Sequence, residues 1–183
     1  MTILHIDSSI NGENSASRTV SRSLVEQLGS AQRSETIIYR DLASDPISHL
    51  TLDAFADTSV LDEFLAADTI VIGAPMYNFT LPSQLKAWID RILVAGTTFR
   101  YTANGPEGLA GGKRVVVALA RGGFYDSGSP AASLEHLETY LRGVFNFIGI
   151  EPEFVAADGL AVIAEQREQS IRQALGETIR LAA

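Results

Sequence analysis

Five short apolar segments recur along the chain, with helical patterns of apolar and polar residues between them. The apolar segments are rich in Val and Ile, and several lack the strict alternation of a half-exposed strand. Continuous apolar runs of this length are typical of strands that are covered on both faces. We therefore predict five strands of a parallel sheet, at residues 2–6, 35–39, 69–73, 114–120 and 153–157.

Apolar residues at spacings of three and four predict the helices of the chain. Each of four such stripes would form one apolar face, and the first runs through residues 17–28. The stripes consist of Val20, Leu24 and Leu28; Leu81, Leu85, Trp88 and Ile92; Leu134, Leu137, Leu141, Val144, Phe145 and Ile148; and Ile171, Leu175 and Ile179.

The order of these elements predicts an α/β fold of three layers, a five-stranded parallel sheet with helices on both faces. No linker or internal repeat divides the chain, so residues 1–183 are expected to form a single domain. Residues 98–113 interrupt the pattern with an alternating Phe-Arg-Tyr-Thr segment and an Asn-Gly-Pro turn signal, which predict a small hairpin. In such a sheet, ligands bind at the carboxyl ends of the strands.

The composition excludes several classes of function. The formal net charge of −8 and the pI of about 4.8 argue against binding to nucleic acid or to an anionic membrane surface. The absence of cysteine excludes disulfides, thiol nucleophiles and iron–sulfur ligation, so redox chemistry would need a bound cofactor. Because no signal-peptide pattern and no apolar run of about 20 residues occurs, we expect no membrane span and a cytoplasmic location.

Serines gather in the loop after the first predicted strand. Ser9, Ser15 and Ser17 lie between that strand and the first helix, where free N–H groups and the helix dipole favour anions. Capping of the helix by Ser15 or Ser17 is the alternative explanation. The chain has no Gly-x-Gly and no Walker-type sequence, so the two common glycine-rich phosphate motifs are excluded. Serine hydroxyls suit the terminal phosphate of a mononucleotide better than an internal pyrophosphate.

The segment Ala-Pro-Met-Tyr-Asn-Phe follows the third predicted strand. Pro75 has no N–H, and we expect it to end the ladder so that the following amides point outward. Tyr77 and Phe79 offer flat apolar surfaces, and Asn78 offers both a donor and an acceptor. Packing of Met76 and the two rings in the core is the alternative. Beside a helix start, this combination favours a planar heteroaromatic ligand.

The fourth predicted strand ends in the sequence Arg-Gly-Gly. Gly122 and Gly123 are expected to let the main chain approach a ligand closely and to adopt backbone angles that other residues resist. Arg121 could equally be a solvated surface charge. Together, the three strand ends would bring phosphate donors, ring-stacking groups and a close-approach segment to one edge. Flavin mononucleotide (FMN) requires this combination.

In these motifs, the chain resembles the family of FMN-dependent NADH azoreductases and quinone reductases, which has the flavodoxin-like fold. The resemblance is carried by the serine loop, MYNF with PSQLKAWID, FRYTANGPEGL, RGG, RDLASDPI (40–47) and YLRGVFNFIGI (140–150). It implies a homodimer with FMN near the subunit interface. It also implies an enzyme that takes hydride from NADH or NADPH and passes two electrons to quinones or azo compounds in ping-pong turnover.

The resemblance also assigns residues. Tyr101 and Phe147 would wall the substrate face, Phe147 from the neighbouring subunit. Two departures stand out: Ala120 replaces the usual Ser or Thr, and residues 44–60 are shorter than in many members. The second departure leaves the choice between NADH and NADPH open. The implied cofactor-binding residues are Ser9, Ser15, Ala16 and Ser17 on the phosphate side, and Met76, Tyr77, Asn78, Phe79, Ala120, Arg121, Gly122 and Gly123 around the isoalloxazine ring.

Hydride transfer to a flavin requires positioning rather than a side-chain acid or base, so no catalytic side chain is assigned. His5, His49 and His136 lack the spacing of metal ligands, and we expect no metal site. The alternating charges of Glu165, Arg167 and Glu168 are expected to form a solvated helix face.

Two other functions remain open at this point. An FMN-binding one-electron carrier of flavodoxin type would fit the acidic composition but would not need substrate-facing aromatic residues. A flavin-free binding domain on the same scaffold is the second alternative. The physiological electron acceptor does not follow from the sequence.

Overall fold

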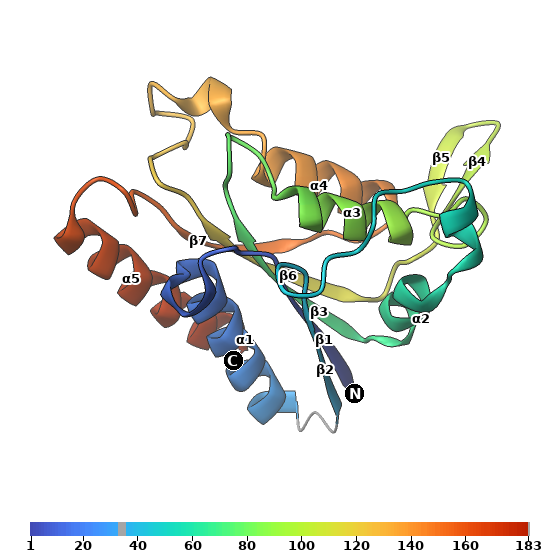
Figure 1. Ribbon diagram of the computed structural model, residues 1–183, viewed down its shortest axis with the longest axis horizontal. Coiled ribbons are helices and arrows are strands. Elements are labelled where there is room, and N and C mark those ends of the chain that lie inside the picture. The colour runs from blue at the N-terminus through green and yellow to red at the C-terminus, as the bar shows by residue number, and fades with distance from the viewer. Residues whose placement is uncertain (33–35, 183) are drawn as a thin grey trace.

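A computed structural model describes residues 1–32 and 36–182 of the chain (Figure 1). Its centre is one sheet of five parallel strands in the order β2-β1-β3-β6-β7. The predicted five-stranded parallel sheet is thus confirmed, although residue 35, the first of the second predicted strand, lies outside the described residues. The strands are β1 (Thr2–Asp7), β2 (Thr36–Asp41), β3 (Thr69–Pro75), β6 (Arg114–Ala120) and β7 (Glu153–Ala157).

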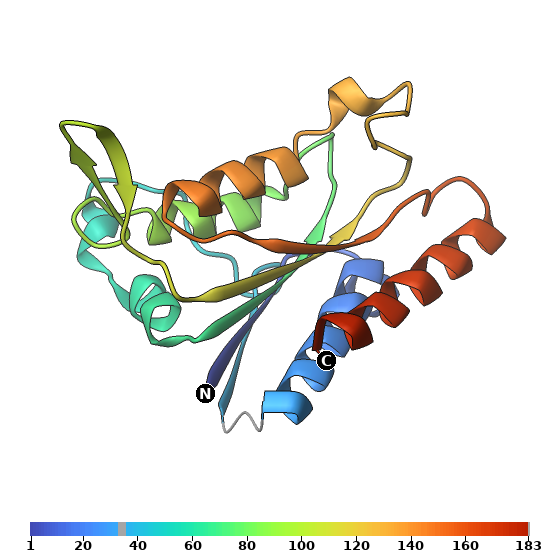
Figure 2. The same cartoon turned by 180° about the vertical axis from the view of Figure 1, so that it is seen from behind.

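Helices cover both faces of the sheet, as predicted. In Figures 1 and 2, α1 and α5 lie on one face, and α2, α3 and α4 lie on the other. Three short 3₁₀ helices, η1 (Gly12–Asn14), η2 (Asp53–Ala56) and η3 (Ala132–Leu134), lie in the connections. The α-helices are α1 (Ala16–Gln32), α2 (Ser59–Ala66), α3 (Ser83–Ile92), α4 (Glu138–Phe147) and α5 (Ala164–Ala182).

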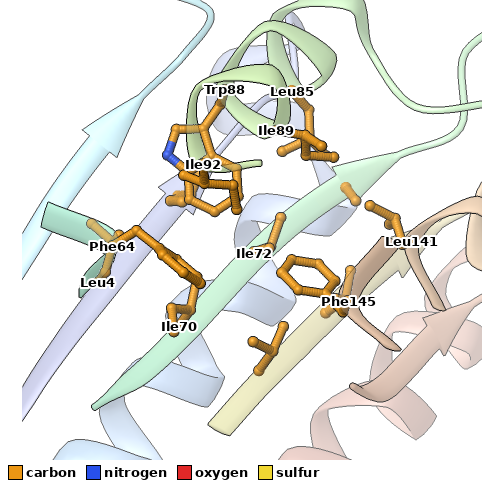
Figure 3. Close-up of a cluster of buried hydrophobic side chains, with 14 of the residues drawn as sticks. Leu4, Phe64, Ile70, Ile72, Leu85, Trp88, Ile89, Ile92, Leu141 and Phe145 are labelled. Atoms are coloured by element: carbon orange, nitrogen blue, oxygen red, sulfur yellow. The ribbon is translucent and has the colours of Figure 1, made fainter. Parts of the chain in front are cut away.

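The larger hydrophobic core lies between the sheet and the layer of α2, α3 and α4 (Figure 3). Its largest side chains, Trp88, Phe64 and Phe145, are fully buried. The rings of Phe64 and Trp88 meet edge to face with their centroids 6.1 Å apart, a favoured aromatic geometry. The stripe predicted for α3 is therefore confirmed as a core face. Helix α2, which contributes Phe64, was not predicted.

The predicted stripe of α5 is wrong. Ile179 is 57% exposed, and the helix instead turns Ser170, Ala174 and Thr178 inward. Small residues allow α5 to approach α1 closely, and the Thr178 hydroxyl lies 2.9 Å from that of Ser23. By contrast, the α1 stripe of Val20, Leu24 and Leu28 is buried as predicted.

The stripe predicted around α4 is only partly right. Leu137, Leu141, Phe145 and Ile148 are fully buried, but Leu134 is 40% exposed. It belongs to η3, ahead of the helix, and therefore does not share the helical repeat.

The predicted hairpin is present as β4 (Phe99–Thr102) and β5 (Gly105–Gly108), which pair antiparallel. It docks on the carboxyl end of α4, where the amide of Ala110 donates to the carbonyl of Ile148 at 2.9 Å. Both views show the hairpin beyond the carboxyl ends of α3 and α4, far from the edge at which the sheet strands end (Figures 1 and 2).

The strand order locates the edge at which sheets of this topology commonly bind ligands. Chain connections run in opposite directions from β1 and β3, so the carboxyl ends of these neighbouring strands form the switch point of a flavodoxin-like sheet. Among the described residues, no helix is long and apolar enough to cross a membrane.

Candidate functional site

The loops after β1, β3 and β6 enclose a hollow of about 170 Å³ at the carboxyl edge of the sheet. We call it the strand-end hollow. Its polar lining comprises Ser9, Asn11, Asn14, Ser15, Tyr77 and Arg167. The remaining lining comprises Ala16, Pro75, Met76, Ala120, Gly122, Leu160 and Ala161. The structure thus brings parts of all three predicted loops together around one space.

The serine loop combines capping with free donors. The Ser15 and Ser17 hydroxyls are 3.0 Å apart, and Ser15 Oγ accepts the amide of Arg18 at 3.3 Å. Ser15 therefore caps α1, as the alternative explanation held. The amides of Ala16 and Ser17 nevertheless have no acceptor among the described residues. Capping and anion binding are compatible at this helix end, because one serine leaves two amides available.

Tyr77 joins two of the loops. Its hydroxyl lies 3.2 Å from Ser9 Oγ and accepts the amide of Ile10 at 3.1 Å. The phenol therefore sets the separation between the serine loop and the loop after β3. Sequence reasoning placed Tyr77 at the ligand but gave no indication of this bridge.

The turn after β3 holds strained backbone. Tyr77 and Thr80 exchange main-chain hydrogen bonds of 2.9 and 3.1 Å. The two residues between them, Asn78 and Phe79, have φ of 48° and 70°, which is uncommon for residues with a Cβ. Their amides have no acceptor among the described residues. Such strain occurs preferentially at ligand sites.

The expectation for Pro75 is wrong in one respect. The amide of Met76 does not point outward but donates to the carbonyl of Ala120 at 2.8 Å, so main-chain pairing continues one residue beyond the proline. The free amides begin only at Asn78, where the tight turn reverses the chain.

The strain at Phe79 yields a stability prediction. We expect Phe79→Gly to leave the free energy of unfolding within about 0.5 kcal/mol of wild type, because glycine adopts positive φ without steric cost. Phe79→Val should lower it by about 1–2 kcal/mol, because a β-branched residue tolerates this region poorly. Urea unfolding of the three proteins would measure both changes.

Phe55 provides the matched control. It is 50% exposed, close to the 44% of Phe79, but its φ is not positive. Phe55→Gly should therefore lose about 1 kcal/mol with no relief of strain. Equal losses for Phe55→Gly and Phe79→Gly would show that the backbone angle of Phe79 carries no cost.

The expectation of unusual backbone angles at the Gly-Gly pair is wrong. Neither Gly122 nor Gly123 has positive φ, and the strain lies at the neighbouring turn instead. Their carbonyls accept the amides of Ala161 at 2.9 Å and Gly159 at 3.0 Å. The amides of both glycines have no acceptor among the described residues. The pair thus keeps two donors free while its carbonyls anchor the loop after β7.

Arg121 is not a solvated charge. Its guanidinium is buried and forms a two-pronged contact with Asp158, at 2.6 and 2.9 Å. Glu138 and Glu135 lie 3.4 and 3.8 Å away. The side chain therefore faces away from the strand-end hollow and anchors the base of the Gly-Gly loop. A contact between Arg121 and a cofactor stays a prediction.

Arg18 holds the serine loop in place through hydrogen bonds. Arg18 donates to the carbonyl of Ser9 at 2.7 Å and makes two bonds of 2.8 and 2.7 Å to the carboxylate of Asp41. These bonds hold the pKa of Asp41 well below its usual range. These bonds within the protein occupy the guanidinium, and Arg18 contributes to the strand-end hollow by holding the carbonyl of Ser9 in place.

The same network contains a buried carboxylate. Burial would raise the pKa of Asp7, but hydrogen bonds from His5 and Ser21 and the charge of Arg18 lower it overall. Burial, with the nearby Asp7 charge, raises the pKa of Tyr39 to about 12. His5 is 3.0 Å from the Ser21 hydroxyl, which fits the structural role expected for it. Among the described residues, no group of His, Asp and Glu could hold a metal ion.

Tyr101 and Phe147 lie at the other end of the molecule. Both rings flank Phe99, with centroid distances of 5.6 Å and 4.6 Å. Tyr101 is 75% exposed. Because the hairpin lies far from the carboxyl edge of the sheet (Figure 1), neither ring can wall the strand-end hollow of its own chain.

Three features of this edge were missed from the sequence. Leu160 and Ala161 enter the hollow from the loop after β7, and Arg167 reaches it from α5. A larger groove of about 630 Å³ lies on the other side of Tyr77 and includes Lys86 and Tyr140. The rule that loops at carboxyl ends share an edge would have pointed to the β7 loop, but no sequence signal distinguished Arg167.

Comparison with known proteins gives a consistent result. Residues 1–181 match the family model described as "Flavodoxin-like fold". The chain is 54% identical over 201 aligned positions to "FMN-dependent NADH:quinone oxidoreductase 2" of Bradyrhizobium diazoefficiens, with both chains covered completely. It is 52% identical to a Methylorubrum extorquens protein named "FMN-dependent NADH:quinone oxidoreductase", again with full coverage of both.

Solved structures show the same fold. An azoreductase from Bacillus anthracis (strain Sterne) superposes with a TM-score of 0.90 at 27% identity, covering 100% of this chain and 98% of that one. An FMN-dependent NADH-azoreductase of Bacillus anthracis (Ames Ancestor), determined in complex with FMN, superposes with a TM-score of 0.84 at 27% identity and covers both chains fully.

Proposed function

The chain belongs to the flavodoxin-like family of FMN-dependent NADH:quinone oxidoreductases, and we propose from this premise how its loops hold FMN and pass electrons to quinones and azo compounds. The protein is an FMN-dependent NAD(P)H oxidoreductase. The observation that supports our assignment of the site is the set of free amides on three loops around the strand-end hollow. Donors without acceptors fit a ligand rich in acceptor atoms.

The phosphate side of FMN fits the serine loop. A phosphate accepts hydrogen bonds from N–H and O–H groups, and a helix start favours its charge. We propose that Ser9, Ser15, Ala16 and Ser17 bind it through hydroxyls and the two free amides. Tyr77 would keep this loop at a fixed distance from the flavin ring.

The ring side fits the other two loops. Met76, Tyr77, Asn78 and Phe79 would line one side of the flavin, and the free amides of the turn can donate to its carbonyl and nitrogen acceptors. When bound, FMN supplies a group that accepts hydride from NADH or NADPH and gives an electron pair to the acceptor. We propose that the main chain of Ala120, Arg121, Gly122 and Gly123 forms the opposite side, while the Arg121 side chain stays bound to Asp158. Donors aimed at the ring stabilise the negative charge that hydride brings.

Two finer proposals concern assembly and location. We propose a homodimer in which Tyr101 and Phe147 of one subunit wall the flavin site of the other. The exposure of Tyr101 supports this role, as does the distance of its hairpin from the carboxyl edge of the sheet (Figure 1). Sedimentation of the FMN-loaded protein tests the dimer. We further propose a cytoplasmic location, where the nicotinamide donor is supplied. A separate proposal concerns Ala120. Because it lacks the hydroxyl of the usual Ser or Thr, it would leave the flavin ring without one side-chain hydrogen bond.

Stopped-flow and steady-state assays test the function. Adding NADH to the FMN-loaded protein without an acceptor should bleach the yellow absorbance, and benzoquinone should restore it, as ping-pong turnover requires. Steady-state reduction of benzoquinone and of an azo dye should proceed at about 1–10³ s⁻¹, the common range for enzymes.

The alternatives predict different results. A flavin that is retained but gives almost no turnover with NADH and benzoquinone would favour a one-electron carrier. A sample that stays colourless after incubation with FMN would favour a flavin-free binding domain. Turnover without bleaching by NADH alone would contradict the ping-pong order but not the activity.

A further inference from the structure

The charge that lines the strand-end hollow is opposite in sign to the net charge of the protein. The chain carries a formal net charge of −8, yet the described residues that line the hollow include no Asp or Glu. Their one charged side chain is the guanidinium of Arg167. A strongly acidic protein thus presents a cation at the place where the FMN phosphate is proposed to bind.

Arg167 lies next to the serine loop although it is distant in sequence. Its Nη2 donates to the carbonyl of Asn14 at 2.9 Å, and Asn14 directly precedes Ser15. The residue belongs to the first turn of α5, which begins at Ala164. The guanidinium therefore contacts the residue that directly precedes Ser15, whose hydroxyl caps α1.

The guanidinium also keeps most of its donors available. Within residues 1–32 and 36–182, no carboxylate lies within 4.0 Å of Arg167, and Asn14 accepts its one side-chain hydrogen bond. The other two arginines at this edge differ, because Arg18 is bound to Asp41 and Arg121 to Asp158. Further along α5, Arg172 pairs with Glu168 at 3.3 Å.

The position of Arg167 in the first turn lowers the stability of α5. A cation in the first turn opposes the positive end of the helix dipole, where acidic residues are favoured. A residue that violates a local rule without a compensating ion pair is a candidate for a functional role. An anion in the strand-end hollow would supply the missing partner.

We infer that Arg167 binds the phosphate of FMN and makes the site select FMN over riboflavin. This inference rests on the proposed function and extends it to a residue outside the three loops. The serine hydroxyls and amides are neutral, so Arg167 would supply the positive charge that a phosphate dianion favours, with a planar fork suited to two phosphate oxygens.

Flavin binding to the apoprotein tests the inference without any turnover. Quenching of flavin fluorescence would give Kd values for FMN and riboflavin with wild type, Arg167→Gln, Arg167→Lys and Arg172→Gln. We expect Arg167→Gln to weaken FMN binding about tenfold or more and to leave riboflavin binding about unchanged. Arg167→Lys should recover part of the loss, because it keeps the charge but not the fork.

Two controls separate charge from structure. Arg172→Gln, on the same helix, should bind both flavins as wild type does. Glutamine at position 167 can still donate to the Asn14 carbonyl, so the loop keeps a tether. Raising the salt concentration should weaken FMN binding by wild type more than by Arg167→Gln, because screening acts on the charge that the variant lacks.

Three results would overturn the inference. Equal losses for FMN and riboflavin would show that Arg167 only tethers the serine loop. Unchanged FMN affinity with a raised KM for NADH would assign the guanidinium to the phosphates of the donor nucleotide. Wild-type protein that binds neither flavin would contradict the proposed function itself, and the inference with it.

Discussion

Replacing Arg18 with alanine is expected to lower the free energy of unfolding by about 3–5 kcal/mol near neutral pH, the usual cost of removing one partner of a buried ion pair. The substitution would leave the Asp41 carboxylate without its two charge-assisted bonds and the carbonyl of Ser9 without its donor. Urea unfolding monitored by circular dichroism would measure the loss. Weaker FMN binding should accompany it, because Ser9 is no longer held.

The loss should depend on pH in a defined direction. In wild type, Arg18 depresses the pKa of Asp41 below its unfolded value of about 3.9, so this stabilisation is fully present above that pH and fades as pH falls through the folded pKa. The variant lacks it. The difference between the two proteins should therefore be largest near pH 7 and shrink below about pH 4.

Two further variants complete this test. Arg18→Lys keeps the charge but not the two-pronged contact, and should lose less than alanine. Arg172→Ala removes an exposed arginine whose ion pair with Glu168 is on the surface, and should change stability by less than about 1 kcal/mol. A difference between wild type and Arg18→Ala that is constant from pH 7 to pH 3.5 would contradict the assignment to Asp41.

Gly108→Ala is expected to detach the hairpin from α4. A Cβ at position 108 would lie 2.1 Å from the amide nitrogen of Gly149 and 2.2 Å from the carbonyl carbon of Ile148. Both are main-chain atoms and cannot rotate away, so the hairpin must move or open, at a cost of about 3 kcal/mol. Hydrogen exchange should become faster in β4 and β5 and in the last turn of α4.

The functional effect should be selective. If Tyr101 and Phe147 wall the partner's flavin site, as proposed, displacing them by about 1 Å should lower kcat/KM for benzoquinone by about a hundredfold. FMN affinity should stay about the same, because the serine loop is far from the hairpin (Figure 1). Gly111→Ala is the control, since its Cβ would meet only the carbonyl oxygen of Gly149, at 3.4 Å. Equal effects of the two substitutions would contradict the steric argument.

Much of the fold followed from local pattern. The segment 114–120, apolar from Val115 onward, predicted β6 correctly because a strand buried on both faces favours apolar residues at successive positions. Val20, Leu24 and Leu28 predicted the buried face of α1 because the helical repeat aligns them. The same reasoning failed for α5, where close packing on α1 favours small residues and leaves Ile179 outside.

The candidate site, like the fold, could be predicted only in part from the sequence. The motifs identified three loops, and parallel strands place their carboxyl ends at one edge, so their meeting could be predicted from topology. The distribution of strain could not. We expected it at Gly122 and Gly123, whereas the structure has it at Asn78 and Phe79, where a two-residue turn requires positive φ.

By itself, the sequence determined the class of fold, the sheet edge at which we propose that FMN binds and the residue types offered there, because periodicity and turn chemistry act over a few residues. Only the tertiary structure decided which charges remain free at that edge. Arg18, Arg121 and Arg167 look alike in the sequence, yet the first two are bound to Asp41 and Asp158, and the third reaches the strand-end hollow. The partners of Arg18 and Arg121 lie 23 and 37 residues away, and Arg167 meets Asn14 across 153 residues, so their roles depend on how the folded chain brings distant segments together.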